Sequence, residues 1–211
     1  MDFIFDPSLV LYLPLWKLNG ASFMSKDTYG HLCTVTGALW RPDGHYFDGT
    51  DDKLTIPDAP SLRLEHLTLD GWVSVVSGGV AVVSKAYSAS RVAYKLLATT
   101  NYVFVQILDE DGTTEVGADH VVATGSGIYH HLAATYDGSI LRFYVNGVEE
   151  DTNECGEFTI PHSTREVTIG ARYEGGWLYG EGVVGESRVY NRALTPQEIQ
   201  NIYLATRWRY R

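Results

Sequence analysis

Residues 129–151 carry the local pattern that most restricts how this chain can fold. Two dipeptides, Asp137-Gly138 and Asn146-Gly147, interrupt runs that are rich in apolar and aromatic side chains. Asp-Gly and Asn-Gly readily supply the positive φ angles of tight β-hairpin turns. The pattern therefore predicts three consecutive antiparallel strands, of which the first two cover residues 129–136 and 139–145.

Strand-like runs alternate with turn signals along most of the sequence, with a turn signal roughly every 8–15 residues, as is typical of an all-β sandwich or barrel. No linker, internal repeat or low-complexity run divides the chain, so we expect one domain over residues 1–211. Further strands are expected over residues 9–15, 31–36, 53–56, 67–76, 80–85, 102–108, 113–116, 167–171 and 182–190.

Only the C-terminal region has a helical pattern. Thr195 can cap a helix, Pro196 suits the first helical position, and Glu198 can complete a capping box with Thr195. A basic aromatic tail follows over residues 206–211, and the sequence identifies no partner for it.

Length and charge exclude several classes of protein. A chain of 211 residues can bury a core that needs no disulfide or metal. The net charge of −10 repels phosphate backbones, so nucleic acid is excluded as a partner. No run approaches the ~18 apolar residues of a membrane span, so we expect no membrane insertion. The first residues also lack the basic and apolar regions of a signal peptide.

The two cysteines, Cys33 and Cys155, leave two alternatives. A single long-range disulfide would suit an exported chain, whereas small buried thiols are common in protein interiors. We favour two thiols, because two cysteines are too few for a disulfide scaffold and lack the spacing of a metal site.

Several segments occur in an order that is typical of one family. They are Phe47-Asp-Gly-Thr-Asp-Asp52, Tyr129-His-His-Leu-Ala-Ala-Thr-Tyr-Asp-Gly138, Leu141-Arg-Phe-Tyr-Val-Asn-Gly147 and Val189-Tyr-Asn-Arg-Ala-Leu194, with the early turn Asp27-Thr-Tyr-Gly30. Together they resemble the concanavalin A-like, laminin-G-like jelly-roll family, in particular its bacterial and viral branch. The resemblance implies an all-β, two-sheet antiparallel jelly-roll sandwich with one short C-terminal helix, and non-catalytic recognition of a glycan or a protein.

The resemblance also implies a structural Ca²⁺ near the acidic turn. Asp48, Asp51 and Asp52 are the expected ligands there, together with Asp27, because Ca²⁺ prefers hard oxygen donors. The alternative is that these aspartates only stabilise turns by accepting hydrogen bonds from nearby amides. One departure weakens the metal site: Gly185 stands where relatives usually carry a carboxylate.

A rival hypothesis is a laminarinase-type glycoside hydrolase acting on β-glucans. Glu149, Asp151 and Glu154 fit the Glu-x-Asp-x-x-Glu pattern of such enzymes. A retaining mechanism needs two carboxyl groups roughly 5–5.5 Å apart on one face. The intervening residues are polar and directly follow a tight turn, which favours a solvated acidic hairpin over a catalytic strand.

Aromatic side chains offer another route to ligand binding, since they can stack on sugar rings. Tyr173, Trp177 and Tyr179 flank Gly175-Gly176 and are the expected ligand-binding residues, with ordinary packing as the alternative. Trp40 and Trp72 lie in strand-like contexts, and we expect both in the core.

The sequence therefore predicts a non-catalytic binding or adhesion module whose rim loops recognise a glycan or protein. We expect it to belong to an extracellular or virion surface assembly, such as a tail fibre, and to self-associate as a homo-oligomer or larger assembly. A purely structural subunit is the remaining alternative.

Overall fold

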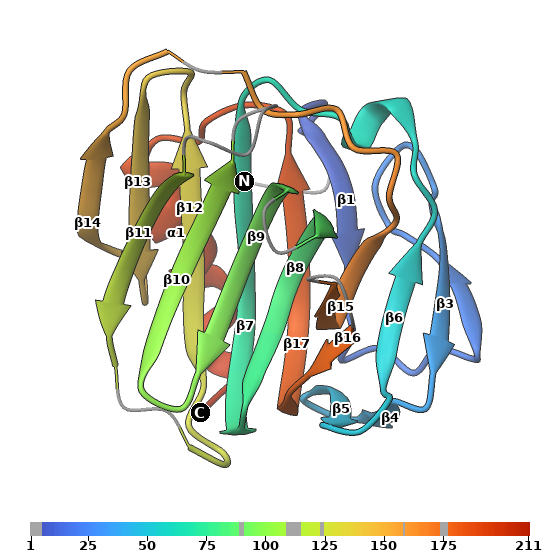
Figure 1. Cartoon of the computed structure of the whole chain (residues 1–211). Helices are drawn as coiled ribbons and strands as arrows, with labels where there is room; N and C mark the ends of the chain where they lie inside the picture. The colour runs from blue at the N-terminus through green and yellow to red at the C-terminus, as the bar shows by residue number, and fades with distance from the viewer. Residues whose placement is uncertain (1–5, 89–90, 109–114, 123–124, 158, 174–176) are drawn as a thin grey trace.

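A computed structural model describes residues 6–88, 91–108, 115–122, 125–157, 159–173 and 177–211. It confirms the predicted architecture of two antiparallel sheets packed face to face, with one short C-terminal helix (Figure 1). We call the sheets A and B.

Sheet A contains the hairpins that the sequence indicates most clearly. Its strand order is β14 (Val148–Glu154), β13 (Ile140–Val145), β12 (His130–Tyr136), β7 (Leu67–Ser77), β17 (Glu181–Tyr190), β5 (Gly44–Asp48) and β4 (Leu39–Arg41), and β1 (Leu9–Leu13) also pairs with β17.

Sheet B faces the viewer in Figure 1. Its order is β11 (Glu115–Val121), β10 (Tyr102–Leu108), β9 (Arg91–Thr99), β8 (Gly79–Ser88), β15 (Val167–Tyr173), β6 (Lys53–Ile56), β3 (Leu32–Thr36) and β2 (Ser22–Met24), and β16 (Trp177–Tyr179) pairs with β15. The strands β2, β4, β5, β9 and β16 were not predicted. Three of them, β2, β4 and β16, are only three residues long, and β9 carries no clear turn signal before it.

Turn chemistry fixes the β12–β13–β14 meander as predicted. Asp137 Oδ1 accepts hydrogen bonds from the backbone N–H groups of Ser139 and Ile140, at 3.0 and 2.8 Å. At the next turn, Asn146 and Gly147 have φ angles of 53° and 79°, the left-handed conformation that such a hairpin needs.

The main core lies between the two sheets and is filled by alternate side chains of their strands. Phe47, Tyr94 and Phe143 are among its largest buried members. Gly170, with a φ of 83°, sits directly against the ring of Phe47, and a Cβ there would overlap that ring. Close packing of this kind leaves little tolerance for added volume.

A second apolar layer covers the outer face of sheet A. The helix α1 (Pro196–Thr206) begins with the predicted capping box, in which both the Thr195 and Glu198 side chains bond to backbone N–H groups. Its Ile199 and Ile202 pack on Tyr144 and Tyr190 of the sheet. In Figure 1 the helix lies behind sheet A, so one outer face of the sandwich is closed.

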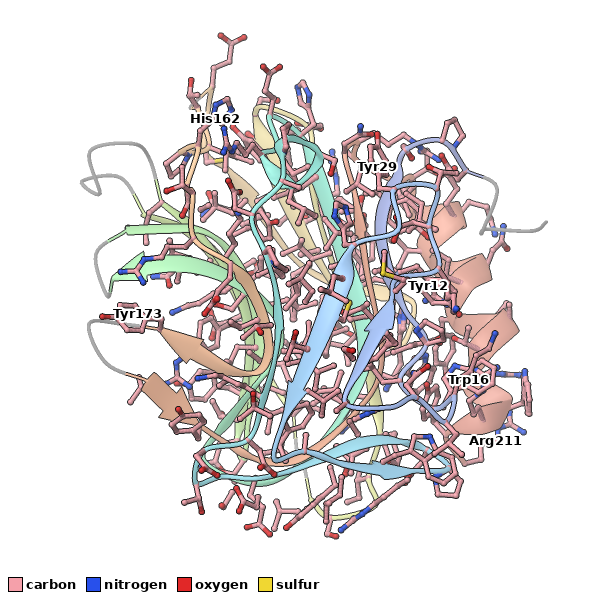
Figure 2. All side chains as sticks on the ribbon, turned by 90° about the vertical axis from the view of Figure 1, so that its right-hand side faces the viewer. Tyr12, Trp16, Tyr29, His162, Tyr173 and Arg211 are labelled. Carbon is pink, nitrogen blue, oxygen red and sulfur yellow. The ribbon has the colours of Figure 1, made fainter. Side chains whose placement is uncertain are left out.

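The C-terminal tail has a partner that the sequence did not reveal. After α1, the turn η3 (Arg207–Arg209) brings the ring of Tyr210 onto Trp72, with the ring centroids 4.5 Å apart. The Trp72 indole also donates a hydrogen bond to Thr206 Oγ1 at 2.8 Å. Gly185 makes room for this contact, because a Cβ there would overlap the Tyr210 ring. The Arg209 guanidinium lies 3.9 Å from the centroid of the Trp16 ring, on the side of the molecule where Figure 2 labels Trp16 and Arg211.

Of the two tryptophans expected in the core, only one is buried. Trp72 is buried beneath the tail on the outer face of sheet A rather than between the sheets. The prediction for Trp40 is wrong: it lies on the short edge strand β4 and is 37% exposed, with its indole N–H bonded to the Trp16 carbonyl. An edge strand has no neighbour to cover its side chains.

A buried layer of charged residues lies between sheet A and the C-terminal segment. Asp70 accepts hydrogen bonds from Arg188 at 3.0 Å, and its Oδ1 lies 3.3 Å from His131 Nε2. Arg188 also donates to Glu186 at 3.0 Å. Burial tends to raise the pKa of Asp70, but the charge of Arg188 and the His131 contact outweigh it, so this pKa is lowered.

Cys33 and Cys155 are unbridged, as the sequence favoured, with Cys33 buried and Cys155 half-buried. Burial raises the pKa of the Cys33 thiol to about 12. Among the described residues, no helix is long and apolar enough to cross a membrane.

Candidate functional site

The acidic turn between β5 and β6 brings three of the predicted metal ligands together. A carboxylate oxygen from each of Asp48, Asp51 and Asp52 lies within 4.8 Å of the others. Asp48 and Asp51 are exposed, whereas Asp52 is buried. Burial, followed by the charges of the two neighbouring aspartates, raises the pKa of Asp52 despite its bond from the Asp48 N–H. Three hard oxygen donors at this spacing fit a Ca²⁺ ion chemically.

The same carboxylates also stabilise the turn. Asp48 Oδ1 accepts from the Thr50 N–H at 2.8 Å, and Asp52 Oδ2 accepts from the Asp48 N–H at 2.9 Å. Each of these two residues therefore keeps one carboxylate oxygen that no backbone bond in the turn uses.

Asp27 does not join this group. Its Oδ1 accepts from the N–H groups of Tyr29 and Gly30, and its Oδ2 accepts from the N–H of Tyr12 at 3.0 Å. Asp27 therefore ties its own turn to strand β1. Gly185 has no side chain that could act as a ligand, and the Tyr210 ring lies against it.

The residues of the hydrolase hypothesis do not assemble. Glu149 pairs with Tyr144 and Glu154 with Ile140, whereas Asp151 pairs with the core residue Phe143 across a bulge. Asp151 therefore lies on the opposite face of β14 from the two glutamates. Five residues at roughly 3.3 Å each place the two glutamates about 13–17 Å apart, far beyond the separation for retaining catalysis. Glu149 instead accepts a hydrogen bond from Thr152 at 2.7 Å.

The three aromatic residues predicted to bind ligand lie on one hairpin, formed by β15 and β16. In its register Tyr173 pairs with Trp177 and Ala171 with Tyr179, so the three aromatic positions share one face. The ring of Tyr173 packs under the Arg165 guanidinium at 4.8 Å, and the ring of Tyr179 lies 6.0 Å from Lys53 Nζ. Figure 2 shows Tyr173 on the part of this hairpin that projects from sheet B. Residues 174–176, which include Gly175 and Gly176, lie outside the described residues.

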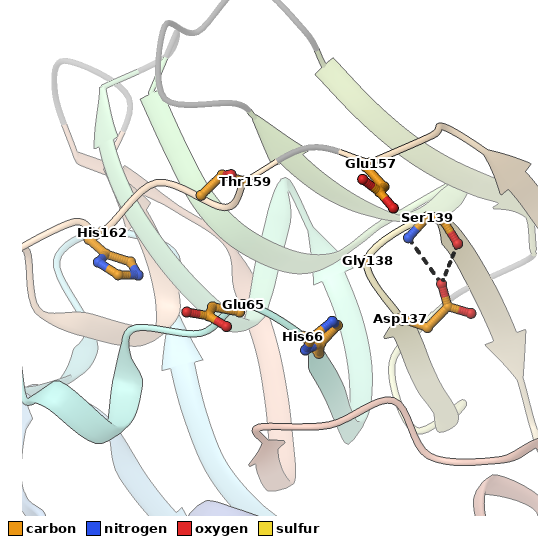
Figure 3. A pocket seen from close by; sticks show the side chains of 8 residues that line it. All are labelled: Glu65, His66, Asp137, Gly138, Ser139, Glu157, Thr159 and His162. Carbon is orange, nitrogen blue, oxygen red and sulfur yellow. Dashed lines mark hydrogen bonds between the residues drawn. The ribbon is translucent and has the colours of Figure 1, made fainter.

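A pocket that the sequence did not indicate opens among the loops at one end of the sandwich (Figure 3). We call it the rim pocket, and its volume is about 580 Å³. Three connections build it: the approach to β7, the β12–β13 turn and the segment between β14 and β15. Its lining residues are Glu65, His66, Asp137, Gly138, Ser139, Glu157, Thr159 and His162.

The geometry of the rim pocket comes from the hairpin chemistry described above. Gly138, with a φ of 99°, lets the turn pass against the His66 ring, which a Cβ there would crowd. Figure 3 shows Asp137 bonded to Ser139, while Glu157, Thr159 and His162 come from the opposite segment. These side chains offer hydroxyl, imidazole and carboxylate groups, which can bond to hydroxyl groups of a polar ligand. They are far apart in sequence, so no motif could have identified them.

Comparisons with known proteins agree with this architecture. A family model described as the concanavalin A-like lectin/glucanases superfamily matches residues 48–200. No curated protein matches the sequence significantly.

Solved structures share the fold at low sequence identity. The botulinum neurotoxin type G receptor-binding domain is 11% identical, with a TM-score of 0.72 over 94% of this chain and 51% of that one. The binding domain of botulinum neurotoxin DC in complex with rat synaptotagmin II is 15% identical, with a TM-score of 0.73 over 94% and 51%. The same domain in complex with SialylT is 13% identical, with a TM-score of 0.72 over 94% and 51%. The chain thus spans about half the length of these neighbours, and the likeness concerns the fold.

Proposed function

Because the chain belongs to the concanavalin A-like lectin/glucanases superfamily, we propose that it is a non-catalytic binding module that recognises a glycan through its rim pocket. The observation that carries the proposal is the pocket itself: an open, polar cavity of about 580 Å³ built by three loops on a rigid sandwich. Ligand sites of this size commonly combine a few convergent polar groups on a fixed scaffold. The dispersed positions of Glu149 and Glu154 support a binding role over hydrolysis.

A glycan array followed by calorimetry tests this proposal. Glu157→Gln should weaken binding of the best array ligand roughly tenfold or more, because a hydrogen bond to a charged group contributes about 1.5–3 kcal/mol. His162→Ala should weaken it roughly threefold to tenfold, because a typical hydrogen bond contributes about 0.5–1.5 kcal/mol. Both side chains are exposed, so the melting temperature should stay nearly constant.

Glu150→Gln is the matched control, since Glu150 is also an exposed glutamate but lies on β14 outside the pocket. Its affinity should equal that of the wild type. An array with no bound glycan, or affinities that both pocket variants leave unchanged, would remove the rim pocket as a lectin site.

The β15–β16 hairpin is our second candidate contact, for a protein ligand. Aromatic side chains are typical anchors of protein interfaces. Tyr179 is only half-buried, and the positions of Tyr173 and Trp177 share its face.

We further propose that the acidic turn binds a structural Ca²⁺ through Asp48, Asp51 and Asp52. At a Ca²⁺ concentration 100 times the dissociation constant, binding adds about 2.7 kcal/mol to stability, or roughly 5–10 °C in melting temperature. We expect calorimetry to record this rise on adding CaCl2 and its reversal by EGTA. Asp51→Asn should abolish most of this rise in melting temperature, because it removes one of the three carboxylates at an exposed position. Equal melting temperatures with CaCl2 and EGTA would leave these aspartates only a role in the turn.

The proposal includes self-association and a place in an extracellular or virion surface assembly. Exposed apolar side chains near one edge, including Leu18, Leu39 and Trp40, support an additional contact surface. Light scattering on the purified protein tests it, with a purely structural subunit favoured by a stable oligomer that binds no glycan.

A further inference from the structure

The outer face of sheet B remains open across β10 and β11. In the register of these strands Tyr102 pairs with Val121 and Phe104 with Asp119. Their side chains face away from the core, since the alternating residues Val103 and Ala118 are buried. Figure 1 shows this face turned toward the viewer with α1 on the far side of the sandwich, and no described element lies across it.

Three side chains, those of Lys95, Phe104 and Tyr102, stack in a row on this face. The rings of Phe104 and Tyr102 are stacked with centroids 5.5 Å apart and an interplanar angle of 28°. Lys95 Nζ lies 5.3 Å from the Phe104 ring centroid. Because Lys95 pairs with Gln106, it lies toward the opposite end of β10 from Tyr102. Phe104 is thus supported from one side, and Tyr102 forms the open end of the stack.

The side chains of Tyr102 and Val121 are more exposed than ordinary cross-strand packing would leave them. Cross-strand aromatic and aliphatic pairs normally stabilise a sheet by covering one another. Tyr102 is nevertheless 43% exposed and its partner Val121 is 79% exposed. An apolar platform is therefore left uncovered on two well-paired strands.

A groove with polar groups borders the platform. It has a volume of about 500 Å³ and is lined by Tyr102, Phe104, Val105, Gly117, Ala118, Asp119 and Asn153. The Asn153 amide N–H donates to the Gly117 carbonyl at 3.1 Å, which fixes the amide and leaves its oxygen as an acceptor. Asp119 is exposed and pairs directly across from Phe104 in the sheet.

We propose that this groove is a second binding site, separate from the rim pocket, and that its ligand is a neutral oligosaccharide. The apolar C–H face of a pyranose suits the open ring of Tyr102, while the sugar hydroxyl groups can donate to Asp119 and Asn153. Charge selects neutral sugars over acidic ones, because the chain carries a net charge of −10 and Asp119 adds a local negative charge.

Nuclear magnetic resonance on ¹⁵N-labelled protein tests the site, using cellohexaose, laminarihexaose and maltohexaose as separate probes. At least one probe should shift the amide signals of residues 102–105 and 117–121. Tyr102→Ala should weaken that binding about fivefold to tenfold, whereas Tyr102→Phe, which keeps the ring, should retain most of it. Asp119→Asn should weaken it by a similar factor.

Two controls separate this site from the rim pocket. Tyr29→Ala is the matched aromatic control, because Tyr29 is 50% exposed but stacks on His31 at another edge of the sheet. Neither it nor the rim-pocket variant Glu157→Gln should change the shifts of β10 and β11. Shifts confined to the rim loops would overturn this second site and leave the proposed function standing. No shift with any of the three probes would also overturn it, while the glycan array would still decide the function of the rim pocket.

Discussion

Replacing Asp70 with alanine is expected to lower the free energy of unfolding by about 1–3 kcal/mol or more, since Arg188 keeps the charge of Glu186 but its buried Nη1 loses its hydrogen-bond acceptor. Asp70 is fully buried, and Arg188, which it binds, is almost fully buried too. The second partner of Arg188, Glu186, is also buried and already shared with Tyr12. Because only 5% of the Arg188 side chain is exposed, water replaces the lost carboxylate poorly.

Denaturant unfolding measures this effect, with Glu154→Ala as the control. Glu154 is an exposed carboxylate on β14, so its loss should change stability by less than about 0.5 kcal/mol. A loss below about 1 kcal/mol for Asp70→Ala would contradict the buried pairing.

The lowered pKa of Asp70 also makes its effect on stability depend on pH. The stability that Asp70 contributes is present above the ordinary pKa near 4 and disappears as pH falls through the lowered value. The difference in stability between wild type and variant should therefore shrink in acid.

Replacing Gly185 with alanine is expected to displace the C-terminal tail. The added Cβ would overlap the Tyr210 ring, so that ring must leave Trp72 or the strand must shift. Overpacking of this kind costs about 1–3 kcal/mol. Trp72 is buried under the tail, so its fluorescence should move toward longer wavelength as water reaches the indole.

A double-mutant cycle shows whether the tail is the cause. In a Tyr210→Ala background the clash has no partner, so Gly185→Ala should cost much less than it does in the wild type. If the two effects are simply additive, Gly185 and Tyr210 do not interact as described.

The sequence predicted the sandwich well because its signals are local. The Asp-Gly and Asn-Gly turns and the Thr195 capping box depend on residues that lie within a few positions of one another. The short edge strand β4 escaped prediction, and Trp40 was misplaced with it, because burial depends on neighbours from distant parts of the chain. The same reason explains the tail: the contact between Tyr210 and Gly185 joins a terminal ring to a strand that no local pattern connects to it.

The candidate sites also differ in whether their residues are contiguous in sequence. The acidic turn is contiguous in sequence, and three of its four predicted members come together. Asp27 was assigned to it only by resemblance, and it serves another turn. The rim pocket and the β10–β11 groove each combine segments separated by tens of residues, so only their three-dimensional arrangement identifies them.

Because α1 packs on the outer face of sheet A, the two outer faces of the sandwich differ: that of sheet A carries the helix, and no described element covers that of sheet B across β10 and β11. A linker attached at the position of the exposed residue Gln200 on α1 would hold the molecule by the helix-covered face of sheet A. Immobilised in this way, the protein would present the face of β10 and β11 to the solution. Such an orientation suits a biosensor surface or a fusion partner better than attachment through a random lysine.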